Sequence, residues 1–427
     1  MIRESEYKQR RTKLIHSLKN NSIALLTSAT PKTRSNDTEF PYRQESNFYY
    51  LSGFKEDNSA LVFIKEKKKV KTILFVYKKD SDEELWNGKR LGKKKAKKLF
   101  DVDEVYLIDE FEEFEEFVKS LAMQFKHFYF DFMQKSSKEF KILEKLSIEN
   151  NHNLTSLVGM QRLIKSPAEI ALIKKALSIT TQAHHNAMSM RKIGLYEYKL
   201  QAEFEYIFKK NGAYSNAYTS IVAGGDNANT LHYIENAQKL KKGELVLIDA
   251  GCEYDYYASD ITRTIPIDGV FTPAQKELYE LVLEVQEKII KMIQPKVLRS
   301  TLQKETVSLL VDGLLELGIM KGSKKKIIKN ESYKSYYPHG IGHWMGLDVH
   351  DASPYKDENN NEIALKEGML LTIEPALYMN KADKKIPKKY RGIGIRIEDN
   401  ILVTKDGYKN LSAGIVKSVE KIESKFL

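Results

Sequence analysis

The stretch LIDAGCEYDYYASDITRT, residues 247–264, ends an apolar run on an acid, Asp249, and carries another, Asp260, eleven residues later. A carboxylate at the end of an apolar strand is costly unless a cation or a hydrogen-bond donor pairs with it. Asp255 lies between the two acids, and we expect it to occupy a turn that brings the flanking strands together. The stretch therefore predicts a strand pair that presents two carboxylates to one site.

A second stretch near the C-terminus repeats this pattern. Residues 243–249 read GELVLID and residues 368–374 read GMLLTIE, so each has a glycine, an apolar strand and an acid six residues after the glycine. Each is followed by a further strand that carries an acid, Asp260 in SDITRTI and Glu398 in GIRIEDNILV. Chance is the alternative for so short a repeat, and the matched second acids argue against it. The pattern predicts two pseudo-symmetric halves that face one site.

Four carboxylates at strand positions need positive charge nearby. Two divalent cations would balance them, and salt bridges to the plentiful lysine and arginine are the alternative. Histidine placement favours metal, because three histidines fall within the twelve residues HGIGHWMGLDVH, residues 339–350. A fourth, His232, lies on a strand-like stretch just before GELVLID. An oxygen-rich site with one imidazole suits Mn²⁺ first and also accepts Co²⁺, Fe²⁺ or Zn²⁺, and two metals bridged by a hydroxide suit hydrolysis.

Length and composition indicate a globular chain of more than one domain. The chain has 427 residues, of which 42% are hydrophobic and 30% charged. It has no run of eighteen apolar residues and no apolar leader followed by small residues, so we expect neither a membrane span nor a secretory signal. The single cysteine, Cys252, excludes an internal disulfide framework and favours a cytoplasmic location.

The formal net charge of +11 raises the possibility of nucleic-acid binding. Most of the excess is lysine in scattered clusters, such as KEKKKVK from Lys65 and KKKAKK from Lys93. No helix-turn-helix, zinc-finger or RNA-binding motif accompanies them. We therefore expect a solvated basic surface and no nucleic-acid partner.

The first third of the chain alternates apolar strands with helices. Strands are predicted at residues 22–28, 59–65, 71–77 and 127–132, and a phenylalanine-rich helix at 109–125. This pattern is typical of a layered α/β domain. A strong helix start follows, with Ser166 as N-cap, Pro167 at the first helical position and Glu169 closing a capping box. We place the boundary just before it, which gives domains 1–164 and 165–427.

The acids and histidines together resemble a known family. The ordered set Asp249, Asp260, His343, Glu374 and Glu398 resembles the five metal ligands of the pita-bread metallopeptidases, which include methionine aminopeptidase, prolidase and aminopeptidase P. The stretches HGIGHWMGLDVHD, IEPALY and GIGIRIEDN resemble motifs of the proline-specific members. NDTEFPYRQESNFYYLSGF, from Asn36, resembles the start of bacterial aminopeptidase P, so the similarity covers essentially the whole chain.

The resemblance implies an α/β (α+β) architecture, with an aminopeptidase P-type N-terminal domain and a C-terminal pita-bread catalytic domain built on pseudo-two-fold strand pairs. It implies that Asp249 chelates one metal ion, that Asp260 and Glu398 bridge both, and that His343 and Glu374 complete the second. Glu374 would also move a proton from the attacking water to the leaving nitrogen.

The resemblance implies further roles around the metals. His232 would stabilise the tetrahedral intermediate, and His350 would contact the substrate backbone. His339 would line the pocket for the proline ring. Arg396, two residues before Glu398, would orient Asp260.

Four more residues are weaker candidates for substrate binding. Tyr218 and Tyr378 would lie near the metals, with plain packing as the alternative. Asp37 would cap the free amine of the substrate. Trp86 would reach the site of a neighbouring subunit in a homodimer or homotetramer, with local packing as the alternative.

The implied reaction removes the N-terminal residue from a peptide whose second residue is proline. The N-terminal motif favours this over an Xaa-Pro dipeptidase, and the large leading domain disfavours methionine aminopeptidase. Two non-enzymes remain as alternatives, a metal-free peptide-binding module of the same fold and a basic nucleic-acid-binding protein. The first would have lost metal ligands, whereas this chain retains all five residues.

Overall fold

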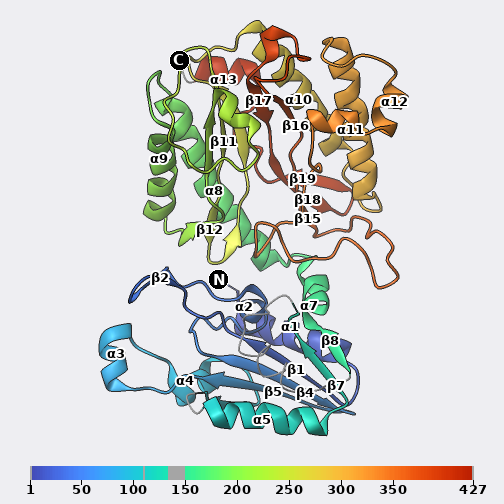
Figure 1. Cartoon of the computed structure of the whole chain (residues 1–427). Coiled ribbons are helices and arrows are strands. Elements are labelled where there is room, and N and C mark those ends of the chain that lie inside the picture. Colours follow the sequence, from blue (N-terminus) through green and yellow to red (C-terminus); the bar gives the residue numbers. More distant parts are fainter. Residues whose placement is uncertain (1, 109–110, 133–149, 426–427) are drawn as a thin grey trace. The chain divides into compact units, whose positions relative to one another are not determined.

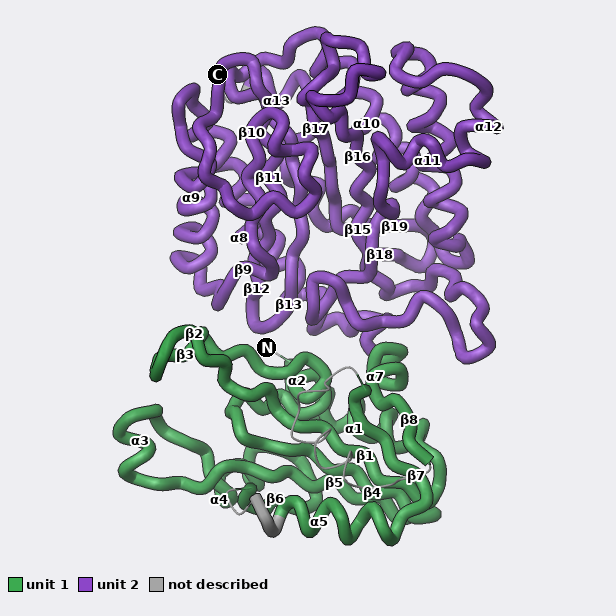
Figure 2. The backbone as a smooth tube through the Cα atoms, in the orientation of Figure 1, with its two compact units in different colours: residues 1–161 green, residues 162–427 purple. Residues whose placement is uncertain are grey.

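The computed structural model describes residues 2–108, 111–132 and 150–425. The chain divides into two compact units, Met1–Gln161 and Arg162–Leu427 (Figure 2). This division falls three residues before the domain boundary expected at residue 164, which remains a prediction.

The first unit is built on a six-stranded mixed sheet in the order β6-β5-β4-β1-β7-β8 (Figure 1). The pairs β1–β4 and β4–β5 are antiparallel, and the pairs β1–β7, β5–β6 and β7–β8 are parallel. The four strands predicted from apolar runs are confirmed as β1, β4, β5 and β7. The strands of this sheet are β1 (Ser22–Thr27), β4 (Ala60–Glu66), β5 (Lys69–Val76), β6 (Glu104–Leu107), β7 (His127–Phe130) and β8 (Asn151–Asn153).

Helix α5 (Phe111–Gln124) packs on this sheet, as the phenylalanine spacing predicts. Phe114, Val118 and Leu121 recur every three or four residues and so lie on one helical face, which is buried in the core of the sheet. Residues 109–110 of the predicted helix lie outside the described residues. The unit also contains α1 (Glu4–Ser17), α2 (Ser46–Ser52), α3 (Ser81–Asn87), α4 (Gly92–Leu99), most of α7 (Leu154–Arg162) and the hairpin of β2 (Thr33–Ser35) and β3 (Thr38–Glu39).

The first long helix of the second unit, α8 (Pro167–Met190), begins where its capping box predicts. The Glu169 backbone N–H donates to Ser166 Oγ at 3.2 Å, and the Ser166 N–H donates to the Glu169 carboxylate at 2.8 Å. The other helices are α9 (Glu197–Lys210), α10 (Pro273–Lys291), α11 (Arg299–Glu316), α12 (Lys324–Lys329) and α13 (Val419–Lys425). Among the described helices, none is both long and apolar enough to cross a bilayer.

Two similar strand arrangements form the centre of the second unit (Figure 1). In the first, β11 pairs antiparallel with β14, and β12 and β13 form a hairpin between them. In the second, β15 pairs antiparallel with β18, with the β16–β17 hairpin between. The strands are β11 (Leu245–Asp249), β12 (Cys252–Tyr254), β13 (Tyr257–Ala258), β14 (Thr262–Pro266), β15 (Leu370–Ile373), β16 (Ala376–Met379), β17 (Ile393–Arg396) and β18 (Asp399–Thr404).

The backbone before each arrangement supports the repeat seen in the sequence. Gly243 and Gly368 precede β11 and β15 in the same left-handed conformation, with φ of 78° and 85°. Only glycine adopts this conformation freely, so both strands leave a similar turn. Asp255 occupies the β12–β13 turn, as predicted. The flanking strands are β9 (Ser215–Asn216), β10 (Ile221–Gly224) and β19 (Gly407–Asn410).

A buried ion cluster ties the start of the second unit to its histidine-rich segment. Lys165 Nζ lies 2.9 Å from Asp351 Oδ2, and Arg162 contacts the other oxygen of the same carboxylate. The Asp351 side chain is 0% exposed. Burial raises the pKa of a carboxyl, but the charges of Arg162 and Lys165 hold the pKa of Asp351 well below its usual range. Asp351 is therefore ionised in the folded chain.

Replacing Asp351 by asparagine should lower the free energy of unfolding at neutral pH by about 3–5 kcal/mol, because the buried Lys165 loses its carboxylate and Arg162 keeps only that of Asp348. The folded-state pKa of Asp351 is depressed, so the cluster stabilises the fold above the unfolded-state pKa of about 4 and loses this effect as the pH falls further. Denaturant unfolding should therefore show the gap between wild type and Asp351→Asn narrowing below about pH 4.

Asp406→Asn is the matched control, because it removes the same charge from an exposed turn. It should change the free energy of unfolding by less than about 0.5 kcal/mol. Equal stability of the two variants at neutral pH would show that the buried cluster contributes nothing.

Candidate active site

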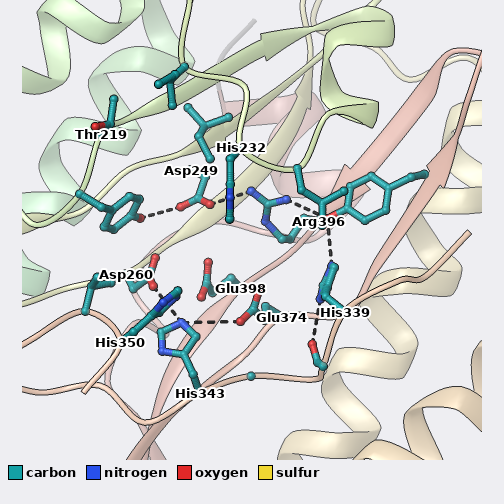
Figure 3. Close-up of a pocket in the computed structure, with 18 of the residues that line it drawn as sticks. Thr219, His232, Asp249, Asp260, His339, His343, His350, Glu374, Arg396 and Glu398 are labelled. Atoms are coloured by element: carbon teal, nitrogen blue, oxygen red, sulfur yellow. Dashed lines mark hydrogen bonds and ion pairs between the residues drawn. The ribbon is translucent and has the colours of Figure 1, made fainter. Parts of the chain in front are cut away.

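One cavity of about 520 Å³ in the second unit gathers most of the predicted site residues (Figure 3). All five predicted metal ligands line it, and so do the six other residues that were predicted in this part of the chain. The ligands are Asp249, Asp260, His343, Glu374 and Glu398. The others are Tyr218, His232, His339, His350, Tyr378 and Arg396.

The four acids lie at the ends of strands. Asp249 is the last residue of β11 and Glu374 directly follows β15. The expectation that Asp260 and Glu398 lie within strands was wrong, because they precede β14 and β18 by two residues and one residue. Side chains within a strand alternate between its two faces, whereas residues beyond the ladder can turn toward one point. Ile373 pairs with Asp399, so Glu374 and Glu398 occupy the next opposed positions.

Asp260, His343 and Glu398 form the closest group, with one potential ligand atom from each lying within 4.8 Å of the others. His343 Nε2 lies 3.3 Å from Asp260 Oδ2 and 3.7 Å from Glu374 Oε1. His343 Nδ1 lies 3.0 Å from the Trp344 carbonyl oxygen, an acceptor that places a proton on Nδ1. This contact orients Nε2 toward the acids, as in metal-binding histidines.

Asp249 lies across the cavity from His343 and is held by two hydrogen-bond donors (Figure 3). The Tyr218 hydroxyl donates to Asp249 Oδ1 at 2.6 Å, and Arg396 Nη2 donates to Oδ2 at 2.6 Å. Each carboxylate oxygen keeps a second lone pair for a metal ion.

The prediction that Arg396 orients Asp260 was wrong, because Arg396 contacts Asp249. Arg396 Nε also donates to Thr262 Oγ1 at 3.1 Å, and Thr262 pairs with Asp249 in the β11–β14 ladder. The guanidinium thus binds both residues of the pair Asp249–Thr262.

The buried acids lack sufficient positive charge from the protein. Burial, reinforced by Asp260 and Asp249, raises the pKa of Glu374 to about 7 despite the opposing charges of His343 and Arg396. Burial and the neighbouring acids raise the pKa of Glu398 well above its usual range, and burial raises that of Asp249. A group of carboxylates that resist ionisation together fits one or more divalent cations. The donor set, rich in oxygen with one imidazole, fits the same conclusion.

The pKa of His343 also reflects the excess of negative charge in the cavity. Burial disfavours the imidazolium, but the hydrogen bond and charge of Asp260, together with the charge of Glu374, outweigh this effect and raise the pKa of His343 to about 9. The acids around His343 therefore favour positive charge at this end of the cavity.

His339 is a neutral hydrogen-bonding group. The Tyr378 hydroxyl accepts from Arg396 Nη1 at 2.8 Å and so donates to His339 Nε2 at 3.0 Å. His339 Nδ1 then donates to the Gly340 carbonyl at 2.8 Å. Burial lowers the pKa of His339 to about 4, which keeps the ring uncharged near neutral pH. Tyr378 therefore links the arginine to the histidine in addition to its packing.

His350 and His232 occupy exposed positions at the cavity. The His350 ring lies edge-on to the His343 ring, with centroids 4.1 Å apart. His232 was expected on a strand, which was wrong, since it lies in a turn after the short helix η1 (Gly225–Asn229). Asn236, four residues after His232, accepts a hydrogen bond from the Val222 N–H of β10 through its side chain, at 2.9 Å. The segment thus contacts β10 here through a side chain and not through strand pairing.

The two N-terminal candidates belong to the first unit. Asp37 is exposed in the tight link between β2 and β3. Trp86 on α3 is 85% exposed, which argues against the packing alternative. Their predicted substrate-binding roles remain predictions.

Several supporting residues carried no sequence signal. Gln286 of α10 is buried, and its amide donates to the carbonyls of Ile373 at 3.1 Å and Ile397 at 3.0 Å. These are the residues directly before Glu374 and Glu398, so one side chain fixes both acids. Thr262 Oγ1 donates to Glu398 at 2.7 Å. Single polar residues in a helix or strand form no motif and acquire this role only through tertiary contact.

Gly342 shows why the histidine-rich segment needs small residues. A Cβ at this position would lie 1.9 Å from the Thr372 carbonyl oxygen. The His343 N–H next to it donates to Thr372 Oγ1 at 3.0 Å. Close approach of the two backbones therefore brings His343 to the end of β15.

Two family models match the chain. The model of metallopeptidase family M24 matches residues 171–405, and the model of the aminopeptidase P N-terminal domain matches residues 7–125. The chain is 38% identical to an Xaa-Pro aminopeptidase of Haemophilus influenzae over 99% of its length and 97% of the relative. It is 39% identical to that of Escherichia coli, covering 99% of this chain and 98% of the relative.

Solved structures agree with this similarity. Proline aminopeptidase P II from Yersinia pestis matches with a TM-score of 0.94 and 37% identity, covering 100% of this chain and 99% of that one. Aminopeptidase P from Escherichia coli with the inhibitor Pro-Leu matches with a TM-score of 0.93 and 38% identity, covering 100% and 98%. A ligand set at paired strand ends, a cavity that gathers it and matches over both units lead to one conclusion. The chain belongs to metallopeptidase family M24, with the N-terminal domain of aminopeptidase P.

Proposed function

We propose that this chain is an Xaa-Pro aminopeptidase, a hydrolase with two divalent metal ions that removes the N-terminal residue from peptides with proline in second position. The observation that carries the proposal is the convergence of all five expected ligands in one cavity. The whole-chain identity to Xaa-Pro aminopeptidases supports the substrate class. We assign the reaction to a catalytic domain, residues 165–427, preceded by a domain of residues 1–164.

The proposed ligands are Asp249, Asp260, His343, Glu374 and Glu398, and Mn²⁺ is the proposed ion, with Co²⁺, Zn²⁺ or Fe²⁺ as alternatives. The donor set and the raised pKa values of the buried acids support two bound cations. When bound, such ions would supply a hydroxide nucleophile and Lewis-acid polarisation of the scissile carbonyl.

The other cavity residues would bind the peptide and move the proton. Glu374 would take a proton from the nucleophile and transfer it to the proline nitrogen, which carries no hydrogen in the peptide bond. His232 and His350 would contact the reacting peptide group. His339, held neutral and oriented by Tyr378, would border the proline ring.

Arg396 would act through Asp249, to which it donates directly. Tyr218 donates to the same carboxylate and would hold it from the other side. A carboxylate fixed by two donors keeps its position when an ion binds, which is the effect expected of supporting groups around a metal.

Two further proposals concern context. The exposed Trp86 supports a homodimer or homotetramer in which Asp37 and Trp86 take part in substrate binding. The single cysteine, Cys252, is buried and supports a cytoplasmic location.

Replacing Glu374 with alanine should lower kcat by about 10²- to 10⁴-fold, because the substitution removes the carboxylate proposed to transfer the proton. Hydrolysis of an Ala-Pro-Ala peptide measures the loss, and circular dichroism checks that the fold persists. Glu367→Ala, in an exposed turn outside the cavity, is the control and should keep full activity. Wild-type turnover by a folded Glu374→Ala variant would contradict the role.

The adjacent histidines should separate metal binding from substrate binding. His350→Ala should slow turnover and leave the metal content intact, whereas His343→Ala should lose metal, because His343 points its Nε2 at the acids. Metal analysis of both purified variants measures this difference. Loss of metal from the His350 variant would place that residue among the ligands.

A hydrolysis panel tests the substrate class directly. Xaa-Pro dipeptides, Xaa-Pro-Xaa tripeptides and longer peptides are compared on metal-stripped enzyme supplied with Mn²⁺, Co²⁺ or Zn²⁺. Cleavage of tripeptides and longer chains is expected, with Mn²⁺ as the most effective ion. Cleavage of dipeptides alone would establish the dipeptidase alternative, and a chain that holds no metal and cleaves nothing would be a peptide-binding module.

A further inference from the structure

The cavity contains a second arginine that the proposed reaction does not use. Arg299, the first residue of α11, lines the cavity together with Gly340, Gly342 and Tyr355. Arg396, the other arginine in the lining, is buried and donates to Asp249, Tyr378 and Thr262. Arg299 forms no ion pair with any carboxylate of the described residues. Its charge is therefore available to a bound molecule.

The guanidinium of Arg299 is already oriented. Its Nη1 donates to the Gly342 carbonyl at 2.6 Å, and its Cζ lies 4.5 Å from the centroid of the Tyr355 ring. Tyr355 in turn stacks on the buried Trp344, with centroids 5.6 Å apart and an interplanar angle of 19°. An arginine held in this way loses little conformational freedom when it binds an anion through its remaining N–H groups.

Helix stability does not explain an arginine at this position. The N-terminus of a helix carries partial positive charge, so a cation in the first turn is unfavourable. The N-cap of α11, Leu298, supplies no side-chain hydrogen bond. The Ser300 N–H in the first turn donates to the Glu362 carboxylate at 2.7 Å, so the helix end already has an anion, and the unpaired positive charge at this wall of the cavity is that of Arg299 itself.

We propose that Arg299 binds a carboxylate carried by the leaving peptide, the part of the substrate that begins with proline. This inference rests on the proposed function. The segment 340–342 connects His339, assigned to the proline ring, with His343, assigned to the metals. Arg299 contacts the carbonyl of Gly342 in that segment. A peptide that continues beyond the proline ring along this segment reaches the guanidinium.

Two sources of such a carboxylate exist, the C-terminus of a tripeptide and an acidic side chain directly after proline. Three substrates distinguish them: Ala-Pro-Ala, Ala-Pro-Ala amide and Ala-Pro-Glu amide. We expect wild type to cleave the free acid with a KM about tenfold lower than that of the neutral amide, the usual effect of one charge-assisted hydrogen bond pair. A similarly low KM for the glutamate amide would show that the side chain also serves.

Arg299→Gln should raise KM for the free acid toward the value for the neutral amide and leave the neutral amide unchanged. Constant kcat and metal content would show that the metal site is intact. Arg299→Lys, which keeps the charge and loses the planar fork, should retain part of the preference. Lys304→Gln, which removes one positive charge from an exposed position of α11, is the matched control and should keep the full preference.

The inference is overturned if Arg299→Gln keeps the wild-type ratio of KM values, or if wild type gives neither the free acid nor the glutamate amide a lower KM than the neutral amide. Failure of wild type to cleave any of the three substrates would refute the proposed function and this inference with it. Cleavage of all three at equal KM refutes only the role of Arg299.

Discussion

The structure of the second unit depends on one electrostatic constraint, the presence of four largely buried carboxylates in a single cavity. The protein supplies Arg396 and one imidazole against them, and the pKa values of Glu374 and Glu398 rise because this is not enough. Desolvated acids without counter-charge would disfavour folding of this region. Divalent metal ions, which the family implies, would reduce this imbalance, so one binding event would stabilise both the site and the core that surrounds it.

The geometry of the cavity follows from the ends of β-ladders. Two antiparallel pairs, β11–β14 and β15–β18, end next to acids that line the same cavity. Buried polar side chains then hold each end in place, with Gln286 bridging the carbonyls before Glu374 and Glu398 and Arg396 holding Asp249. The internal repeat thus has a physical use, since two copies of one strand arrangement present acids from opposite sides. An ion between them would be bound by both halves.

The two cavity arginines illustrate how similar side chains acquire different functions. Arg396 donates hydrogen bonds to Asp249, Tyr378 and Thr262, and the carboxylate of Asp249 neutralises its charge. Arg299 is oriented by a carbonyl and an aromatic ring, neither of which neutralises it. We therefore propose that the first supports the metal site and that the second recognises substrate. In that case, a substitution at Arg299 would change specificity for the C-terminal part of the peptide without altering the proposed metal ligands.

The sequence by itself determined four strands of the first unit, the two strands that end at Asp249 and Glu374, the start of α8 and the metal-ligand candidates, because hydrophobic period, capping residues and short motifs are local properties. The sequence did not show that Asp260 and Glu398 lie just outside their strands, that His232 lies in a turn or that Arg396 contacts Asp249. Only tertiary structure decided these points, since each depends on where a ladder ends or which distant side chain fills a space. The roles of Gln286 and Arg299 arise in the same way, from contacts between segments far apart in the chain.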